Sequence, residues 1–288
     1  MDKALQVIRK NQIDLIDTGY LIPYGIIGYL LSEITGIPYV LRHGGSDLEK
    51  FLRKDVFNDL LKNVFQNASA IITDNESREI FQSLNSRLCM VPRYIPDERY
   101  FKPSMSSHDM PTFAYIGKIN YYWRHKGLHR IAEIFSGIEG DYRLIFIGQG
   151  KGFEKFSEFV SGYGLGDWEF RQFVHPANMP RLLSEIDFLI CFAKDDPIRD
   201  FSNVFCEALW SGVRVLTDDA MDLGIYAEHI ELTSEDQIVN LPMDDVGTTR
   251  AKIIEMIEGW KEPVRYNNKV KYNFNRYLDS NLEIYHRI

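Results

Sequence analysis

The chain has 288 residues, of which 45% are hydrophobic and 26% charged, and its formal net charge is −8. This length suits about two domains of ~100–200 residues each. The apolar fraction allows a sizeable core, and the charged fraction argues against a disordered chain. The acidic balance argues against a general nucleic-acid-binding protein, because such proteins carry a basic face. It leaves room for a local basic pocket.

The three cysteines indicate buried thiols rather than a metal site. Each lies in an apolar run, and their spacing is not that of metal ligands, which suits a reducing compartment. The most apolar stretch, 20–31, is too short to span a bilayer, and no targeting segment stands at the N-terminus. We therefore expect a cytoplasmic protein.

Short apolar runs alternate with helical patterns through the first hundred residues. Strands are predicted over 14–19, 38–43, 69–74 and 88–92, with helices between them. This alternation is typical of βαβ units and a parallel sheet. The helix predicted over 47–66 has a broad apolar stripe, for which core packing is the favoured role. The alternative is peripheral contact with a membrane surface.

A linker and a second alternating series follow. The stretch 95–111 contains three prolines and predicts the linker. Strands are predicted beyond it over 112–117, 142–148, 168–174, 187–192 and 213–218, and a helical tail begins near 261. The sequence therefore predicts an α/β protein with two Rossmann-like parallel domains. Ligands of such sheets bind beyond the carboxyl ends of the strands, and the cleft between two domains is the default site.

Two strand ends in the second series carry candidate ligand-binding residues. Lys118 follows the strand that ends at Gly117, and Lys126 precedes a helix, so that fixed positive charge and free N–H groups suit a diphosphate. The alternative is a pair of solvated lysines. Gly148 and Gly150 follow the next strand and allow a turn or the close approach of a ligand. No complete G-x-G-x-x-G motif is present, which disfavours an NAD site.

His43 and Glu207 are the polar candidates that remain. His43 ends a predicted strand beside two glycines and is placed for contact with a polar substrate. Glu207 stands among apolar residues early in a predicted helix, where a carboxylate needs a partner, either a sugar diol or an internal salt bridge. Ser202, Asn203 and Val204 offer backbone N–H groups at the start of that helix.

Taken together, these segments resemble a known family. The runs "YIGK…HKG", "IGQG" and "FSNVFCEALWSGVRVL", with "IPYVLRHGGSD" and "VPRYIPDERYFKP" before them, resemble the retaining nucleotide-sugar glycosyltransferases of the GT-B fold, glycosyltransferase family 4. The resemblance runs from about Asp14 to about Leu216. It implies an acceptor-side domain over 1–103 that is incomplete at its N-terminus. A donor-binding domain over 104–262 and a helical tail over 263–288 that packs back on the first domain would follow.

The resemblance also implies an activity. A retaining hexosyltransferase would move a sugar from a UDP- or GDP-linked donor to an acceptor hydroxyl, in polysaccharide or glycoconjugate biosynthesis. It would need no cofactor or metal, because lysines and helix dipoles stabilise the leaving diphosphate. Lys118 and Lys126 would neutralise that diphosphate, Glu207 would hold the ribose and His43 would reach the sugar. The donor-binding residues would be Gly117, Gly148, Gly150, Phe173, Val174, Arg199, Asp200, Ser202, Asn203 and Val204.

Arg199 departs from the family pattern, which has a glutamate eight positions before Glu207. Three accounts remain open. Asp200 or Asp196 takes over the role, or Arg199 pairs with an acidic donor sugar, or the site is catalytically dead.

The front of the first domain is the second departure. Roughly two βα units of the family pattern have no counterpart before residue 14, so we expect an open sheet edge and a partner chain or second copy that completes the domain. The alternative function is a non-catalytic nucleotide-sugar-binding or partner subunit of a split glycosyltransferase.

Overall fold

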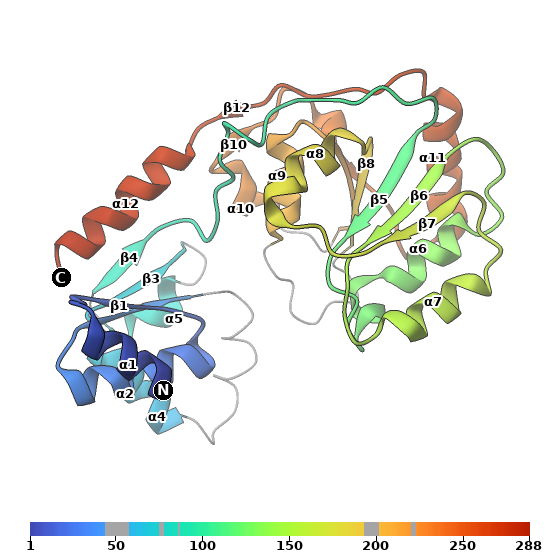
Figure 1. Ribbon diagram of the computed structural model, residues 1–288. Coiled ribbons are helices and arrows are strands. Elements are labelled where there is room, and N and C mark those ends of the chain that lie inside the picture. The colour runs from blue at the N-terminus through green and yellow to red at the C-terminus, as the bar shows by residue number, and fades with distance from the viewer. Residues whose placement is uncertain (44–57, 75–77, 86, 193–201, 220–222) are drawn as a thin grey trace. The chain divides into compact units, whose positions relative to one another are not determined.

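The computed structural model of the chain describes residues 1–43, 58–74, 78–85, 87–192, 202–219 and 223–288. The chain divides into two compact units (Figure 1). Unit 1 comprises Met1–Ile95 and Phe274–Ile288, and unit 2 comprises Pro96–Asn273. Residues 263–273 of the predicted tail thus belong to unit 2, and its terminal helix belongs to unit 1. Each unit has a parallel sheet with helices, which confirms the predicted fold class.

Unit 1 is built on a four-stranded parallel sheet. Its strand order is β1 (Ile16–Gly19), β2 (Tyr39–Arg42), β3 (Ala70–Thr73) and β4 (Leu88–Met90). The helices are α1 (Asp2–Lys10), the π-helix η1 (Leu21–Gly25), α2 (Ile26–Thr35), α4 (Asn58–Asn67), α5 (Arg78–Gln82) and α12 (Phe274–His286). The end of the helix predicted over 47–66 lies in α4, and residues 47–57 lie outside the described part.

Strand β2 shows why this sheet is buried on both faces. Successive side chains of a strand point to opposite faces. Tyr39 and Leu41 accordingly lie in a cluster with helix residues such as Leu61, while Val40 lies in a second cluster with Ile284 of α12. The last helix of the chain therefore covers one face of a sheet whose strands come from the first hundred residues.

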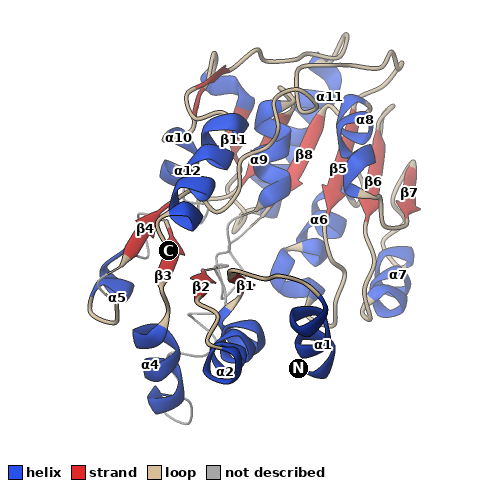
Figure 2. Cartoon of the chain, turned by 60° about the vertical axis from the view of Figure 1, so that its left-hand side comes forward, coloured by secondary structure: helices blue, strands red, loops and turns tan. Residues whose placement is uncertain are grey.

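Unit 2 is built on a six-stranded parallel sheet. Its order is β11 (Ile238–Asn240), β9 (Arg214–Thr217), β8 (Phe188–Cys191), β5 (Thr112–Ile116), β6 (Arg143–Ile147) and β7 (Trp168–Arg171). Figure 2 shows β8, β5, β6 and β7 side by side in this order. After β5, the chain adds β6 and β7 on one side of it. It then crosses over and adds β8 on the other side. The carboxyl ends of β5 and β8 are thus a switch point, where sheets of this kind bind ligands.

Helices and one small ribbon complete unit 2. The helices are η3 (Trp123–Lys126), α6 (Leu128–Phe135), α7 (Phe153–Ser161), η4 (Pro176–Asn178), α8 (Met179–Ser184), α9 (Asn203–Trp210), α10 (Gly224–Ala227), η5 (Glu235–Gln237) and α11 (Val246–Gly259). The strands β10 (Ile230–Glu231) and β12 (Lys269–Val270) pair antiparallel. Every strand predicted from the sequence is present. β10, β11 and β12 were not predicted, because runs of two or three residues give no periodic signal.

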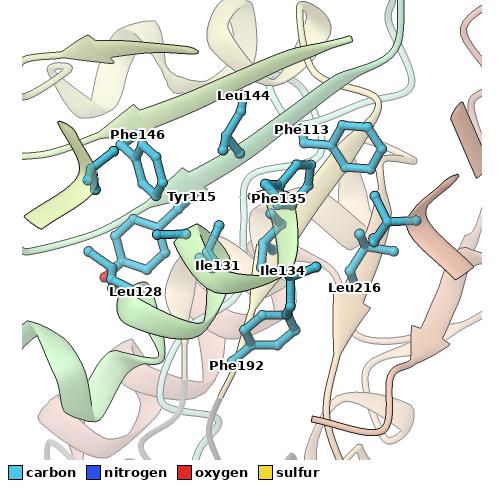
Figure 3. Close-up of a cluster of buried hydrophobic side chains, with 14 of the residues drawn as sticks. Phe113, Tyr115, Leu128, Ile131, Ile134, Phe135, Leu144, Phe146, Phe192 and Leu216 are labelled. Carbon is cyan, nitrogen blue, oxygen red and sulfur yellow. The ribbon is translucent and has the colours of Figure 1, made fainter. Parts of the chain in front are cut away.

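The core of unit 2 fixes β5 and β6 against α6. Leu128, Ile131 and Phe135 recur on one face of that helix and are buried. Figure 3 shows them facing side chains of the strands, Phe113 among them. The Phe113 ring also stacks on that of Phe188 from β8, with their centroids 4.6 Å apart. Because β5 is anchored to both a helix and a neighbouring strand, the loop that follows it starts from a fixed point.

Candidate functional site

A pocket of about 790 Å³ opens beyond the carboxyl ends of β5 and β6 in unit 2. Its volume falls within the roughly 300–1,000 Å³ of ordinary small-molecule sites. Apolar side chains make most of the wall, from Ile116 and Ile147 at the strand ends to Met179. The polar lining side chains are Lys118, Asn120, Gln149, Lys151 and Glu207.

The pocket brings together most of the predicted donor-binding residues. It is lined by Gly117, Lys118, Gly148, Gly150, Phe173, Val174, Val204 and Glu207. Lys126, Ser202 and Asn203 belong to unit 2 but do not line it. Arg199 and Asp200 lie outside the described residues, so all three accounts of Arg199 stay open.

Two loops at the floor of this pocket are joined backbone to backbone. The amide of Gly117 donates to Ile147 O at 2.9 Å, that of Ile119 to Gln149 O at 3.1 Å, and that of Gly152 to Ile119 O at 3.0 Å. The loop after β5 and the loop after β6 therefore extend the sheet pairing beyond the strands. A single rigid platform results.

The glycines of the second loop are there because the first loop leaves no room. A Cβ on Gly148 would lie 1.8 Å from Gly117 O, and one on Gly150 would lie 2.3 Å from Ile119 O. Gly152, which the sequence did not single out, would meet Asn120 O at 2.0 Å. The sequence predicted a turn or the approach of a ligand. The structure shows a third reason, the packing of one loop on the other.

Glu207 is placed by helix α9. Ser202 caps this helix, its hydroxyl accepting from Phe205 N at 3.3 Å. Phe205 and Leu209 are fully buried, and Glu207 is only 8% exposed while it lines the pocket. Burial raises the pKa of the neighbouring Cys206 thiol, and the charge of Glu207 adds to that rise. A carboxylate at this depth is a strong hydrogen-bond acceptor toward a ligand in the pocket.

Comparisons with known proteins identify the fold of the chain. The sequence model of the family "Glycosyl transferase 4-like" matches residues 1–75. A sucrose-phosphate synthase from Thermosynechococcus elongatus is similar in structure, with a TM-score of 0.65, 16% identity, and coverage of 89% of this chain and 67% of its own. HepE from Anabaena, in complex with UDP-glucose, has a TM-score of 0.64 and 15% identity, with coverage of 99% and 80%. The chain has the GT-B fold.

A third similar structure is a glycosyltransferase from Rickettsia africae, with a TM-score of 0.61, 12% identity, and coverage of 99% of this chain and 79% of its own. No curated protein matches the chain. The predicted resemblance to GT-B glycosyltransferases is therefore confirmed at the level of the fold, and the family's match covers the first 75 residues.

Lys126 of this GT-B chain lies beside the carboxyl end of β8. Its charge lowers the pKa of the Cys191 thiol, and so does a hydrogen bond with Ser202, although burial is the largest effect and raises that pKa to about 11. Gly127 follows with a left-handed φ of 71°, and a Cβ there would lie 3.0 Å from Phe192 Cβ. The Lys-Gly pair of the predicted motif thus places its lysine next to the start of α9.

His43 belongs to unit 1. It directly follows β2 and is 4% exposed, with Nδ1 3.4 Å from Thr73 Oγ1 and its ring edge-on to Phe81 at 5.3 Å. The side chain therefore lies at the carboxyl ends of β2 and β3. Its role toward the donor sugar stays a prediction.

Sequence reasoning missed Asn120, Gln149 and Lys151, which the pocket contains. Each lies within three residues of a glycine that the sequence had singled out, so the strand-end loops carried a usable signal. The described part of the chain holds no group of side chains suited to a metal ion, and its three cysteines are free. Among these residues, no helix is long and apolar enough to cross a membrane.

Proposed function

We propose that this chain is a retaining glycosyltransferase that uses a nucleoside-diphosphate sugar and an acceptor hydroxyl. The observation that carries the proposal is the shared pocket of the paired loops, Lys118 and buried Glu207 at the switch point of the unit 2 sheet. The HepE structures, which contain UDP, UDP with glucose, or UDP-glucose, support a UDP-linked donor.

Each pocket residue then has a task in binding the donor. Glu207 accepts hydrogen bonds from the two ribose hydroxyls, since a carboxylate presents two oxygens to two adjacent donors. Lys118 and the N-terminal amides of α9 stabilise the diphosphate. Phe173, which is 55% exposed, and Val174 flank the base. An exposed aromatic ring beside an apolar wall is suited to stacking on a planar ring.

The proposed reaction moves one sugar. The oxygen of the acceptor hydroxyl forms a bond to the anomeric carbon on the face from which the diphosphate leaves. The bond between that carbon and the phosphate oxygen breaks, the electron pair stays with the diphosphate, and the acceptor proton passes to the leaving oxygen. Lys118 and the N-terminus of α9 stabilise the negative charge that develops on the leaving oxygen. The reaction is proposed to proceed without a metal ion, and full activity in EDTA would support this.

Calorimetric titration with UDP, GDP and their sugars tests the donor site. We expect one nucleotide to bind, and Lys118→Gln and Glu207→Gln to weaken it by about tenfold or more each, as charge-assisted hydrogen bonds are lost. Glu158→Gln, an exposed change on α7, is the matched control. If no nucleotide binds the wild-type chain, the proposal fails.

Turnover separates an enzyme from a binding subunit. Release of the free nucleotide from the donor that binds, with or without added acceptors, would support catalysis. NMR of the product would give the anomeric configuration, and inversion would contradict the retaining mechanism. Binding without any release of nucleotide would favour the non-catalytic alternative.

A further inference from the structure

The described lining of the pocket contains two lysines, Lys118 and Lys151, whereas the sequence pointed to Lys118 and Lys126. Lys118 follows β5 and Lys151 follows β6, and both residues line the pocket and are exposed. Within the described residues, neither ammonium group has an acidic partner.

The backbone at Lys151 is fixed by its two neighbours. Gly150 and Gly152 stand on either side of it, and both pack against the loop after β5. The amide of Gly152 donates to Ile119 O at 3.0 Å. Lys118 precedes Ile119, so the same clamp determines where both lysine side chains begin. The backbone positions of the two lysines are thus held on one platform, so less backbone entropy is lost when their side chains share a ligand.

The surroundings of the two ammonium groups favour an anion. Apolar residues such as Ile116 and Ile147 line the pocket beside them, and a less polar wall strengthens the attraction between opposite charges. Glu207 is the one carboxylate among the described lining residues, and it comes from α9 rather than from the platform. An ammonium group donates only, and suits phosphate oxygens as a mobile point charge.

We propose that Lys151 is a phosphate-binding residue, which shares the diphosphate of the nucleotide with Lys118. This inference rests on the proposed function, since it names a further residue of the same donor site. Lys126 does not line the pocket, and its charge acts on Cys191 near the start of α9. In this proposal it would reach the diphosphate from the side of α9.

The test measures affinity for uridine, UMP and UDP, with guanosine, GMP and GDP alongside, by calorimetry at constant ionic strength. Lys151→Gln removes the charge and leaves a polar side chain that is one atom shorter. We expect it to weaken binding of the preferred diphosphate by about tenfold and to leave the nucleoside unchanged. Lys151→Arg should restore most of the affinity. Lys155→Gln is the matched control. Lys155 is an exposed residue of α7, four positions after Lys151, and this variant should bind as the wild type does.

Each other outcome is decisive. If Lys151→Gln binds the diphosphate as tightly as the wild-type chain, the role of Lys151 is overturned while the donor site stands. An equal loss for nucleoside and diphosphate also overturns it, because the residue would then act on the base or on the fold. If the wild-type chain binds no nucleotide, the proposed function fails and this inference falls with it.

Discussion

Gly148 faces the carbonyl of Gly117 so closely that a Cβ atom on Gly148 would lie 1.8 Å from that oxygen. The φ of Gly148 is 154°, a region that residues with a side chain rarely adopt. The contact joins the ends of β5 and β6, the two neighbouring strands that lead into the pocket. The integrity of the pocket floor therefore depends on the absence of one methyl group.

The variant Gly148→Ala tests this dependence. We expect it to lower the free energy of unfolding of unit 2 by about 2–4 kcal/mol, from overpacking and backbone strain together. The measurement is urea unfolding followed by tryptophan fluorescence. Gly259→Ala is the control, because nothing lies within 4 Å of a Cβ there. Equal stability of the two variants would contradict the close approach.

The sequence allowed the sheet of unit 2 to be anticipated, because its strands are apolar runs such as 143–147 between turn residues. It also gave Lys118 and Glu207 as pocket residues. Local sequence patterns could not predict which loops pack against each other. The segment 147–152, "IGQGKG", contains no signal that its glycines pack against the backbone of residues 117–120. That backbone lies about thirty residues earlier in the chain. Lys151 was overlooked for the same reason, since its place in the pocket comes from that pairing.

The packing of α12 on the sheet of unit 1 also joins residues that lie far apart in the sequence. The hydroxyl of Tyr285 donates to Asp17 Oδ2 at 2.5 Å, and Arg42 Nη2 lies 2.6 Å from the same hydroxyl. Tyr285 is on α12, Asp17 on β1 and Arg42 on β2. No periodicity in the sequence links positions 268 residues apart. The composition of the tail predicted a helix, and the family resemblance implied that it packs on the first domain, but neither indicated the strands that it contacts.

The variant Tyr285→Phe should loosen this attachment. Removing one hydroxyl that both donates and accepts should lower the free energy of unfolding of unit 1 by about 1 kcal/mol. Burial, with the hydrogen bond to Asp17, raises the pKa of Tyr285 to about 12. A raised pKa means that the contribution is complete below pH 10 and is lost as the pH rises toward 12. The difference between the wild type and the variant should therefore shrink over that interval.

Thermal unfolding at pH 8, 10 and 11.5 measures this difference. Leu282→Ala is a control on the same helix, because that side chain is half exposed and lacks a titratable group. The gap between Leu282→Ala and the wild type should stay constant with pH. A constant gap for Tyr285→Phe as well would contradict the assignment of the raised pKa to this contact.

Cys191 offers a chemical probe of the region beside α9. Burial is the main cause that raises the pKa of its thiol to about 11, while Lys126 and Ser202 partly oppose the rise. At pH 8 roughly one thiol in a thousand is then ionised, and the thiolate is the reactive form. We expect Cys191 in the folded chain to react with iodoacetamide far more slowly than the same residue in urea, as measured by mass spectrometry of its peptide.

Replacing Lys126 tests whether its charge lies close to the Cys191 thiol. The ammonium group lowers the pKa of Cys191, so Lys126→Gln should raise this pKa further and slow alkylation at pH 9–10 by about two- to fivefold. Lys252→Gln, on α11, should leave the rate unchanged. If Lys126→Gln reacts as fast as the wild-type chain, Lys126 does not lie beside β8, and its place as a cation on the α9 side of the donor site is contradicted. A slower rate together with weaker binding of the diphosphate would place the same ammonium group next to both the thiol and the ligand.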